Sequence, residues 1–157
     1  MDITDWWSIE MNSRSKLLAL VALLFLFPVL MLPAPALRIR VSGRWILKLD
    51  GTDLTGGAGT DFPATFQSAV DQVTLTISNA VASWNIDVRR IDVNWDAGFS
   101  LEANHGGGYQ TVTTTDASFL TGSGDTAVDV QFQFGGISVT DPLDDYVTTV
   151  VWTVTDT

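Results

Sequence analysis

Cysteine is absent from the sequence, and histidine occurs once, at His105. No disulfide framework can therefore form, and one imidazole without thiols cannot build a zinc site of the cysteine/histidine type. A lipid-modified N-terminal cysteine is excluded for the same reason. Stability has to come from side-chain packing and strand pairing, which a chain of 157 residues can supply without covalent cross-links.

Lysine and glutamate are also scarce. After residue 36 the sequence holds one lysine, Lys48, and one glutamate, Glu102, whereas threonine and valine are frequent. Helix surfaces favour Lys and Glu, and strands favour β-branched residues, so the composition predicts strands and turns. The net charge of −10 argues against a nucleic-acid partner, because phosphate contacts need Lys and Arg.

One long run carries no charge: residues 17–32 (LLALVALLFLFPVLML), with Arg14 and Lys16 before it and Ala34, Pro35 and Ala36 after it. A basic segment, an apolar segment and a small-x-small site in that order predict a secretory signal peptide, cleaved after Ala36. The run is shorter than the roughly 20 residues of a membrane-spanning helix. The alternative is an uncleaved N-terminal anchor that leaves the rest of the chain outside the cell.

Either interpretation divides the chain into residues 1–36, a signal peptide or membrane anchor, and residues 37–157, an extracellular or cell-surface domain. Membrane contact is then expected only through the N-terminal segment, if it stays uncleaved. The true start is open, since Met11 begins a more basic leader than Met1 does.

Alternation of apolar and polar residues predicts the strands of this domain. The longest stretch is residues 39–49, where Arg38, Arg40, Arg44 and Lys48 take the opposite face. It predicts one long first strand. Its apolar face is the candidate assembly strand, able to pair with another molecule: Ile39, Val41, Trp45, Leu47 and Leu49.

Further strands are predicted at residues 73–77, 84–88, 99–103, 128–134 and 146–154. The last is apolar on both faces, which predicts a central strand or one that needs a partner. The apolar phase changes after Arg90, which predicts a β-bulge or a strand break. Residues 51–72 and 119–125 are predicted as loops. Many short strands predict an all-β fold, an antiparallel β-sandwich of the immunoglobulin-like or jelly-roll-like kind after the N-terminal hydrophobic segment; a closed barrel is the alternative.

No residue set in the sequence forms a catalytic constellation. The His105-Gly106-Gly107-Gly108 run resembles the oxyanion-hole motif of lipases, but the chain has no G-x-S-x-G elbow and no second histidine to act as base. We therefore predict that the protein is not an enzyme and needs no cofactor. Calcium is the open alternative, because hard cations bind loop carboxylates such as Asp50, Asp53, Asp61, Asp141, Asp144 and Asp145, although Asp is also a common turn residue.

The aromatic residues suggest a second type of site. Trp45, Trp84 and Trp152 are in phase with apolar strand faces and are predicted to be core. Trp95, Tyr109 and Phe119 lie near turns and are the candidate ligand-stacking residues, which would bind cell-wall glycan if they were exposed together.

The chain ends on Tyr146 and, after five residues, Trp152-Thr153-Val154, and it also contains Trp45-Ile46-Leu47. This tail resembles the closing strand of WxL cell-surface domains, which would imply attachment to peptidoglycan. Residues 84–157 are similar to uncharacterised exported bacterial β-sandwich surface proteins. That resemblance implies export and a sandwich fold.

These features predict a non-enzymatic, exported structural or assembly subunit of an envelope layer or fibre. The alternative is a carbohydrate- or cell-wall-binding module. The expected partners are further copies of the chain or another envelope protein, with cell-wall glycan as a further candidate. For the first and last strands, pairing within one monomer remains the alternative to pairing between molecules.

We expect the mature chain to begin at Leu37, because Ala36 and Ala34 occupy the −1 and −3 positions that signal peptidases require. N-terminal sequencing of protein taken from the medium or the envelope measures this directly. A chain that still begins at Met1 or Met11 would identify an uncleaved anchor.

Overall fold

The computed structural model describes residues 35–157. Residues 1–34, which contain the predicted export run, lie outside the described part. Residues Ala36–Thr157 form one compact unit with its own hydrophobic core. The described part of the chain contains strands and turns only, and none of it is a helix able to cross a membrane.

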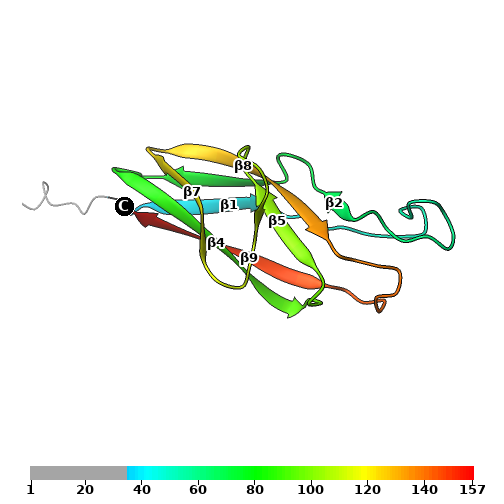
Figure 1. Cartoon of the computed structure of the whole chain (residues 1–157). Helices are drawn as coiled ribbons and strands as arrows, with labels where there is room; N and C mark the ends of the chain where they lie inside the picture. The colour runs from blue at the N-terminus through cyan, green and yellow to red at the C-terminus, as the bar shows by residue number, and fades with distance from the viewer. Residues whose placement is uncertain (1–34) are drawn as a thin grey trace, which may run out of the picture. The chain divides into compact units, whose positions relative to one another are not determined.

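Within residues 35–157, nine strands form two antiparallel sheets packed face to face (Figure 1), so the predicted β-sandwich is confirmed and these sheets do not close into one barrel. The larger sheet has the order β1-β3-β8-β5-β6, with β2 also paired to β8, and the smaller sheet has the order β7-β4-β9. The strands are β1 (Arg38–Gly43), β2 (Thr65–Gln67), β3 (Val73–Ser78), β4 (Ser83–Asn94), β5 (Ser100–Asn104), β6 (Gln110–Thr111), β7 (Ala117–Ser123), β8 (Thr126–Gly135) and β9 (Val147–Asp156).

The core lies between the sheets and is built from the alternating residues that the sequence marks as apolar. Leu75, Ile77, Ile86 and Val130 are almost completely buried. Trp84 is 2% exposed, and its Nε1 donates to the carbonyl oxygen of Gly124 at 2.9 Å, so burial leaves no unpaired donor. The predicted core positions of β3, β4, β5 and β8 are therefore confirmed.

The predicted loop at residues 119–125 is wrong, because most of it belongs to β7. Phe119 is 3% exposed and points into the core. Gly122, which read as a turn residue, lies opposite Trp84 in the β4–β7 ladder, and a Cβ there would come within 2.4 Å of the Trp84 ring. The glycine is needed for close packing of a large ring, not for a turn.

The phase change in β4 has a different cause from the predicted bulge after Arg90. The β4–β9 register runs without a shift from Trp84 to Asp92, and the irregularity falls between Asp92 and Asn94. Ile91 and Val93 are exposed, at 44% and 76%, because they lie on the outer face of the smaller sheet. The apolar phase switches because apolar residues occupy a solvent-facing side.

The last strand is at an edge, not in the centre of a sheet. Among the described strands, β9 pairs with β4 only. Its inner-face residues Val150, Trp152 and Val154 pack against the core. β1 is likewise an edge strand, paired with β3 only, and it lies close to β9. The β1 edge of the larger sheet and the β9 edge of the smaller sheet thus lie on the same side of the sandwich.

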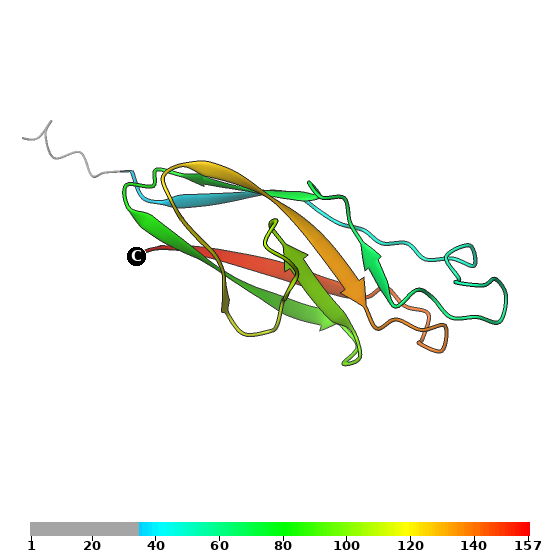
Figure 2. The same ribbon diagram turned by 45° about the horizontal axis from the view of Figure 1, so that its top comes forward.

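The first strand is shorter than predicted. β1 ends at Gly43, which has φ +100°, and a Cβ at this position would lie 2.2 Å from the carbonyl oxygen of Gln72. Residues 44–50 continue as an extended chain outside any ladder. The long β1–β2 and β8–β9 connections project from the end of the sandwich opposite to the C-terminus (Figure 2).

Replacing Trp152 by alanine should destabilise the domain by about 3 kcal/mol. The ring packs edge-on against buried Phe119 with centroids 5.0 Å apart, so truncation leaves a cavity between the sheets. Thermal and denaturant unfolding measure the loss. Thr153→Ala, an exposed neighbour on the outer face, is the control and should change stability little. Equal unfolding midpoints for the two variants would place the Trp152 ring outside the core.

Candidate binding groove

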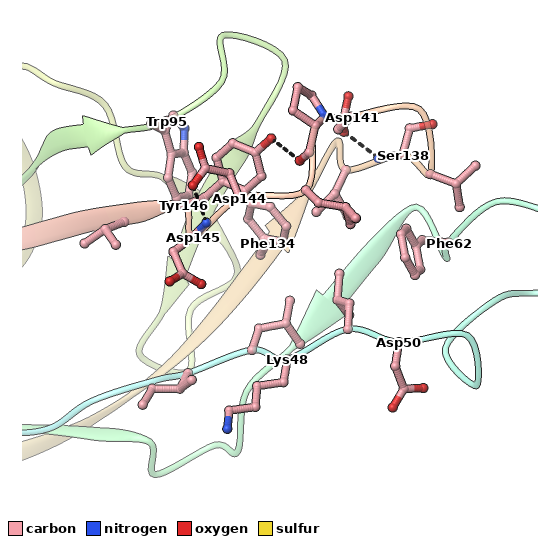
Figure 3. A pocket seen from close by; sticks show the side chains of 18 of the residues that line it. Lys48, Asp50, Phe62, Trp95, Phe134, Ser138, Asp141, Asp144, Asp145 and Tyr146 are labelled. Carbon is pink, nitrogen blue, oxygen red and sulfur yellow. Dashed lines mark hydrogen bonds between the residues drawn. The ribbon is translucent and has the colours of Figure 1, made fainter.

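A groove of about 980 Å³ lies at the end of the sandwich from which the long loops project. One wall is the chain that follows β1, and the other is the chain that joins β8 to β9 (Figure 3). We call it the loop-end groove. Apolar side chains dominate its lining, including Leu47, Leu54, Phe62, Ile137 and Leu143.

The first wall is the arm, defined here as residues 44–50. Trp45, Leu47 and Leu49 are half-buried, whereas Ile46 and Lys48 are exposed. Trp45 stacks on Phe132, a core residue of β8, with ring centroids 6.5 Å apart. The arm therefore keeps the side-chain alternation of a strand and is held against the sandwich by its inner face.

The backbone of the arm is unpaired. Within residues 35–157, the N–H and C=O groups of residues 45–49 make no hydrogen bond. The ends are held: the Gln72 side-chain amide donates to the Arg44 carbonyl oxygen, and the Asp50 N–H donates to Asp53 Oδ2 at 2.8 Å. A strand-like segment thus exposes a free hydrogen-bonding edge beside an apolar groove.

The second wall is the β8–β9 connection, which is folded onto itself by short hydrogen bonds. The Tyr146 hydroxyl donates to the Pro142 carbonyl oxygen at 2.7 Å, and the Ser138 N–H donates to Asp141 Oδ2 at 2.7 Å. Leu143 on this wall is fully exposed. This exposed leucine, in a structured turn beside the groove, offers an apolar surface to a binding partner.

Asp61 joins the two connections. Its Oδ1 accepts from the N–H groups of Val139 and Phe62, at 2.9 and 2.8 Å, and its Oδ2 accepts from the Ser138 hydroxyl at 2.9 Å. The Val139 N–H bond, followed by the other two, lowers the pKa of this carboxyl below its ordinary value. The carboxylate therefore fixes the β1–β2 connection to the β8–β9 connection.

An aromatic cluster lies at the inner end of the groove. The Trp95 ring meets Phe99 and Phe134 edge to face, each at 5.6 Å, and Tyr146 packs on Phe99 at 4.8 Å. The Arg90 guanidinium lies over Trp95, 4.9 Å from the ring centroid.

Arg90 has little other polar support. Its Nη1 is 3.2 Å from Asp92 Oδ1, close enough for an ion pair but without hydrogen-bond geometry, and its Nε is buried without a partner among the described residues. The guanidinium is held mainly by charge and by the Trp95 ring.

The rim of the groove is negative. Asp50, Asp141, Asp144 and Asp145 line it, and Lys48 is the one lining cation among the described residues. The pKa of the Tyr146 phenol is raised, first by burial and then by the nearby charges of Asp141, Asp144 and Asp96. A cationic group would therefore be attracted to this end of the domain.

The candidate stacking residues do not form one surface. Phe119 is buried and contacts Trp152 and His105. Tyr109 is half-buried, and its hydroxyl has no partner in the described residues. Trp95 alone of the three lines the groove, half-buried. No aromatic contact within residues 35–157 joins any two of them.

The aspartates considered for calcium serve several separate local roles. Asp50 accepts from the Thr52 N–H and hydroxyl, both at 2.7 Å, which lowers its pKa, and Asp61 is fully engaged as described. Asp144 accepts from the Asp145 N–H at 2.7 Å. No group of three or more metal-ligating side chains converges in the part of the chain that the structure describes.

Sequence reasoning identified the arm residues Trp45, Leu47 and Leu49 and missed the opposite wall. The sequence predicts Tyr146 only as the start of the last strand and indicates no site role for Ile137 or Leu143. One signal was present: Leu143 is an apolar residue within the acidic turn Asp141-Pro142-Leu143-Asp144-Asp145. No family model, curated protein or solved structure matches this chain.

Replacing Asp61 by asparagine should lower the melting temperature at neutral pH, because an amide has only one oxygen to accept the three hydrogen bonds. The folded-state pKa of Asp61 is depressed, so its stabilisation is complete above the ordinary value of 3.8 and is lost as the pH falls through the folded-state pKa. The gap between wild type and Asp61→Asn should therefore close in acid.

Thermal melts across the acid range test this, with Asp71→Asn as the control, because Asp71 is exposed. A gap that persists at a pH well below 3.8 would contradict the role given to the carboxylate.

Proposed function

We propose that this protein is a non-enzymatic, exported subunit of a cell-surface layer or fibre, which joins its neighbours by strand pairing. One observation carries the proposal: the edge strands β1 and β9 lie on the same side of the sandwich, and each has one edge without a ladder partner within residues 35–157. Unpaired strand edges are templates for pairing with another chain.

The two edges differ in their protection. Arg38 and Arg40 are exposed on β1, and basic residues are a common device against edge-to-edge pairing. β9 lacks such a device: from Val147 to Thr155 it has no charged residue, no proline and no glycine. Its composition is rich in Val and Thr, which favour strands. The β9 edge is therefore the better template for contact with a neighbour.

Export is the second part of the proposal and is supported by the order of residues 14–36. The chain's one histidine, His105, packs edge-on to Phe119 at 4.9 Å and does not line the loop-end groove.

A carbohydrate- or cell-wall-binding module is the second candidate, and the position of Trp95 favours it. This tryptophan lines the groove together with Tyr146 and rim carboxylates, which is chemistry that can bind sugars. However, Phe99 and Phe134 pack against Trp95, and Arg90 lies over its ring. These contacts leave little free ring face for stacking, so the assembly role is the conclusion.

If the proposal is correct, the chain from Leu37 onward should self-associate with rising concentration, and Thr149→Lys should reduce this. Thr149 is exposed on β9, where a lysine would supply the missing edge protection. Thr121→Lys, on the exposed edge of β7, is the matched control. Light scattering and negative-stain microscopy measure the outcome. A wild-type chain that stays monomeric at high concentration, and in isolated envelope material, would overturn the proposal.

A further inference from the structure

We infer that the loop-end groove is an acceptor slot for one extended segment of another polypeptide, with apolar side chains at alternate positions and Lys or Arg between them. The segment would add as a strand to the arm. This inference deepens the proposed function, on which it rests, by naming the attachment site and the chemistry of the strand that enters it.

The backbone of the arm supplies the first argument. Residues 45–49 are extended, their side chains alternate between half-buried and exposed, and their N–H and C=O groups have no partner among the described residues. An incoming strand would satisfy one row of these groups. Five paired residues span about 17 Å, enough to define a register.

The shape of the groove supplies the second argument. β1 and β9 lie close together, whereas beyond Gly43 the chain diverges: Lys48 of the arm and Tyr146, which directly precedes β9, lie on opposite sides of the groove (Figure 3). The opening has a free strand-like edge on one side and the free edge of β9 on the other. An inserted strand therefore has hydrogen-bonding groups on both flanks and an apolar floor beneath.

Charge decides the chemistry of the occupant. Four carboxylates line the groove, at Asp50, Asp141, Asp144 and Asp145, against one lining cation among the described residues, Lys48. Apolar side chains fit the lining of Leu47, Leu54 and Ile137, and basic side chains reach the rim. A glycan would satisfy neither the free backbone edge nor the aliphatic lining, so a polypeptide is the better occupant.

The probe is a synthetic peptide with the sequence of residues 37–49 of this chain (LRIRVSGRWILKL), which has the required alternation of apolar and basic residues. Residues Ala36–Thr157 are one compact unit with a complete core, so the chain from Leu37 onward is used, with the full chain in parallel. Binding is measured by fluorescence anisotropy at concentrations where light scattering reports a monomer. Hydrogen exchange then locates the bound peptide.

We expect the peptide to bind and to slow amide exchange at residues 45–49. A scrambled peptide of the same composition, and a peptide with Glu in place of each Arg and Lys, should bind much more weakly. Methylation of alternate peptide nitrogens should abolish binding, because strand addition depends on backbone N–H groups.

Three variants test the charge argument. Asp144→Asn combined with Asp145→Asn should weaken binding about three- to tenfold and reduce its salt dependence, whereas Lys48→Gln should strengthen it. Asp71→Asn, an exposed acid that does not line the groove, is the control and should bind as wild type does.

The inference is overturned if the peptide does not bind, if the scrambled peptide binds equally, if the arm amides stay unprotected, or if a neutral cell-wall glycan binds the groove and displaces the peptide. If the Asp144→Asn and Asp145→Asn variant assembles as the wild type does, this inference is wrong and the proposed function is still supported. Peptide binding by a chain that never assembles or attaches would defeat the proposed function instead.

Discussion

The architecture depends on a junction along one edge of β8, which carries two partners in succession. β3 pairs with residues 126–130 and β2 with residues 133–135. Ser68 fills the gap between them: its N–H donates to the Phe132 carbonyl oxygen at 2.9 Å, and its buried hydroxyl accepts from the Phe132 N–H at 2.8 Å. Because the chain then turns, with the Gln72 N–H bonded to the Ala69 carbonyl oxygen, β3 begins only at Val73, and β1 finds no partner beyond Gly43. The unpaired arm and the groove beside it follow from this junction.

The groove also needs its walls held apart, since apolar surfaces in water favour contact with each other. Asp61 supplies a polar constraint of this kind. It lies in the β1–β2 connection beyond the arm and binds two residues of the β8–β9 connection, Ser138 and Val139, so that the second wall is tied at a fixed place. On the arm side, Trp45 stacks on Phe132 and holds the inner face of the arm on the core. The Asp61 carboxylate and the Trp45–Phe132 pair thus position the site. Strand pairing alone would not fix these loops.

Side-chain burial could be read from the sequence more reliably than backbone pairing. The alternation in β3, β4 and β8 gave their core faces correctly, because period two reports which side of an extended chain is buried. The same alternation runs through Trp45 and Leu49, where the chain is extended and half-buried but unpaired, so periodicity could not reveal the end of β1. β7 was missed because glycine is a common turn residue, whereas Gly122 lies within the strand and leaves room for the Trp84 ring. The groove was only partly predictable, since its second wall comes from residues about ninety positions further along the chain.

The position of β9 also bears on when this domain can fold. β9 is the most C-terminal strand described, and it supplies Val150, Trp152 and Val154 to the core and the long ladder to β4. Until it is synthesised, the smaller sheet is a two-stranded ribbon with an uncovered apolar face, which is marginally stable at best. Pairings between residues so distant in sequence also form slowly. Nascent chains should therefore stay unfolded through most of their synthesis.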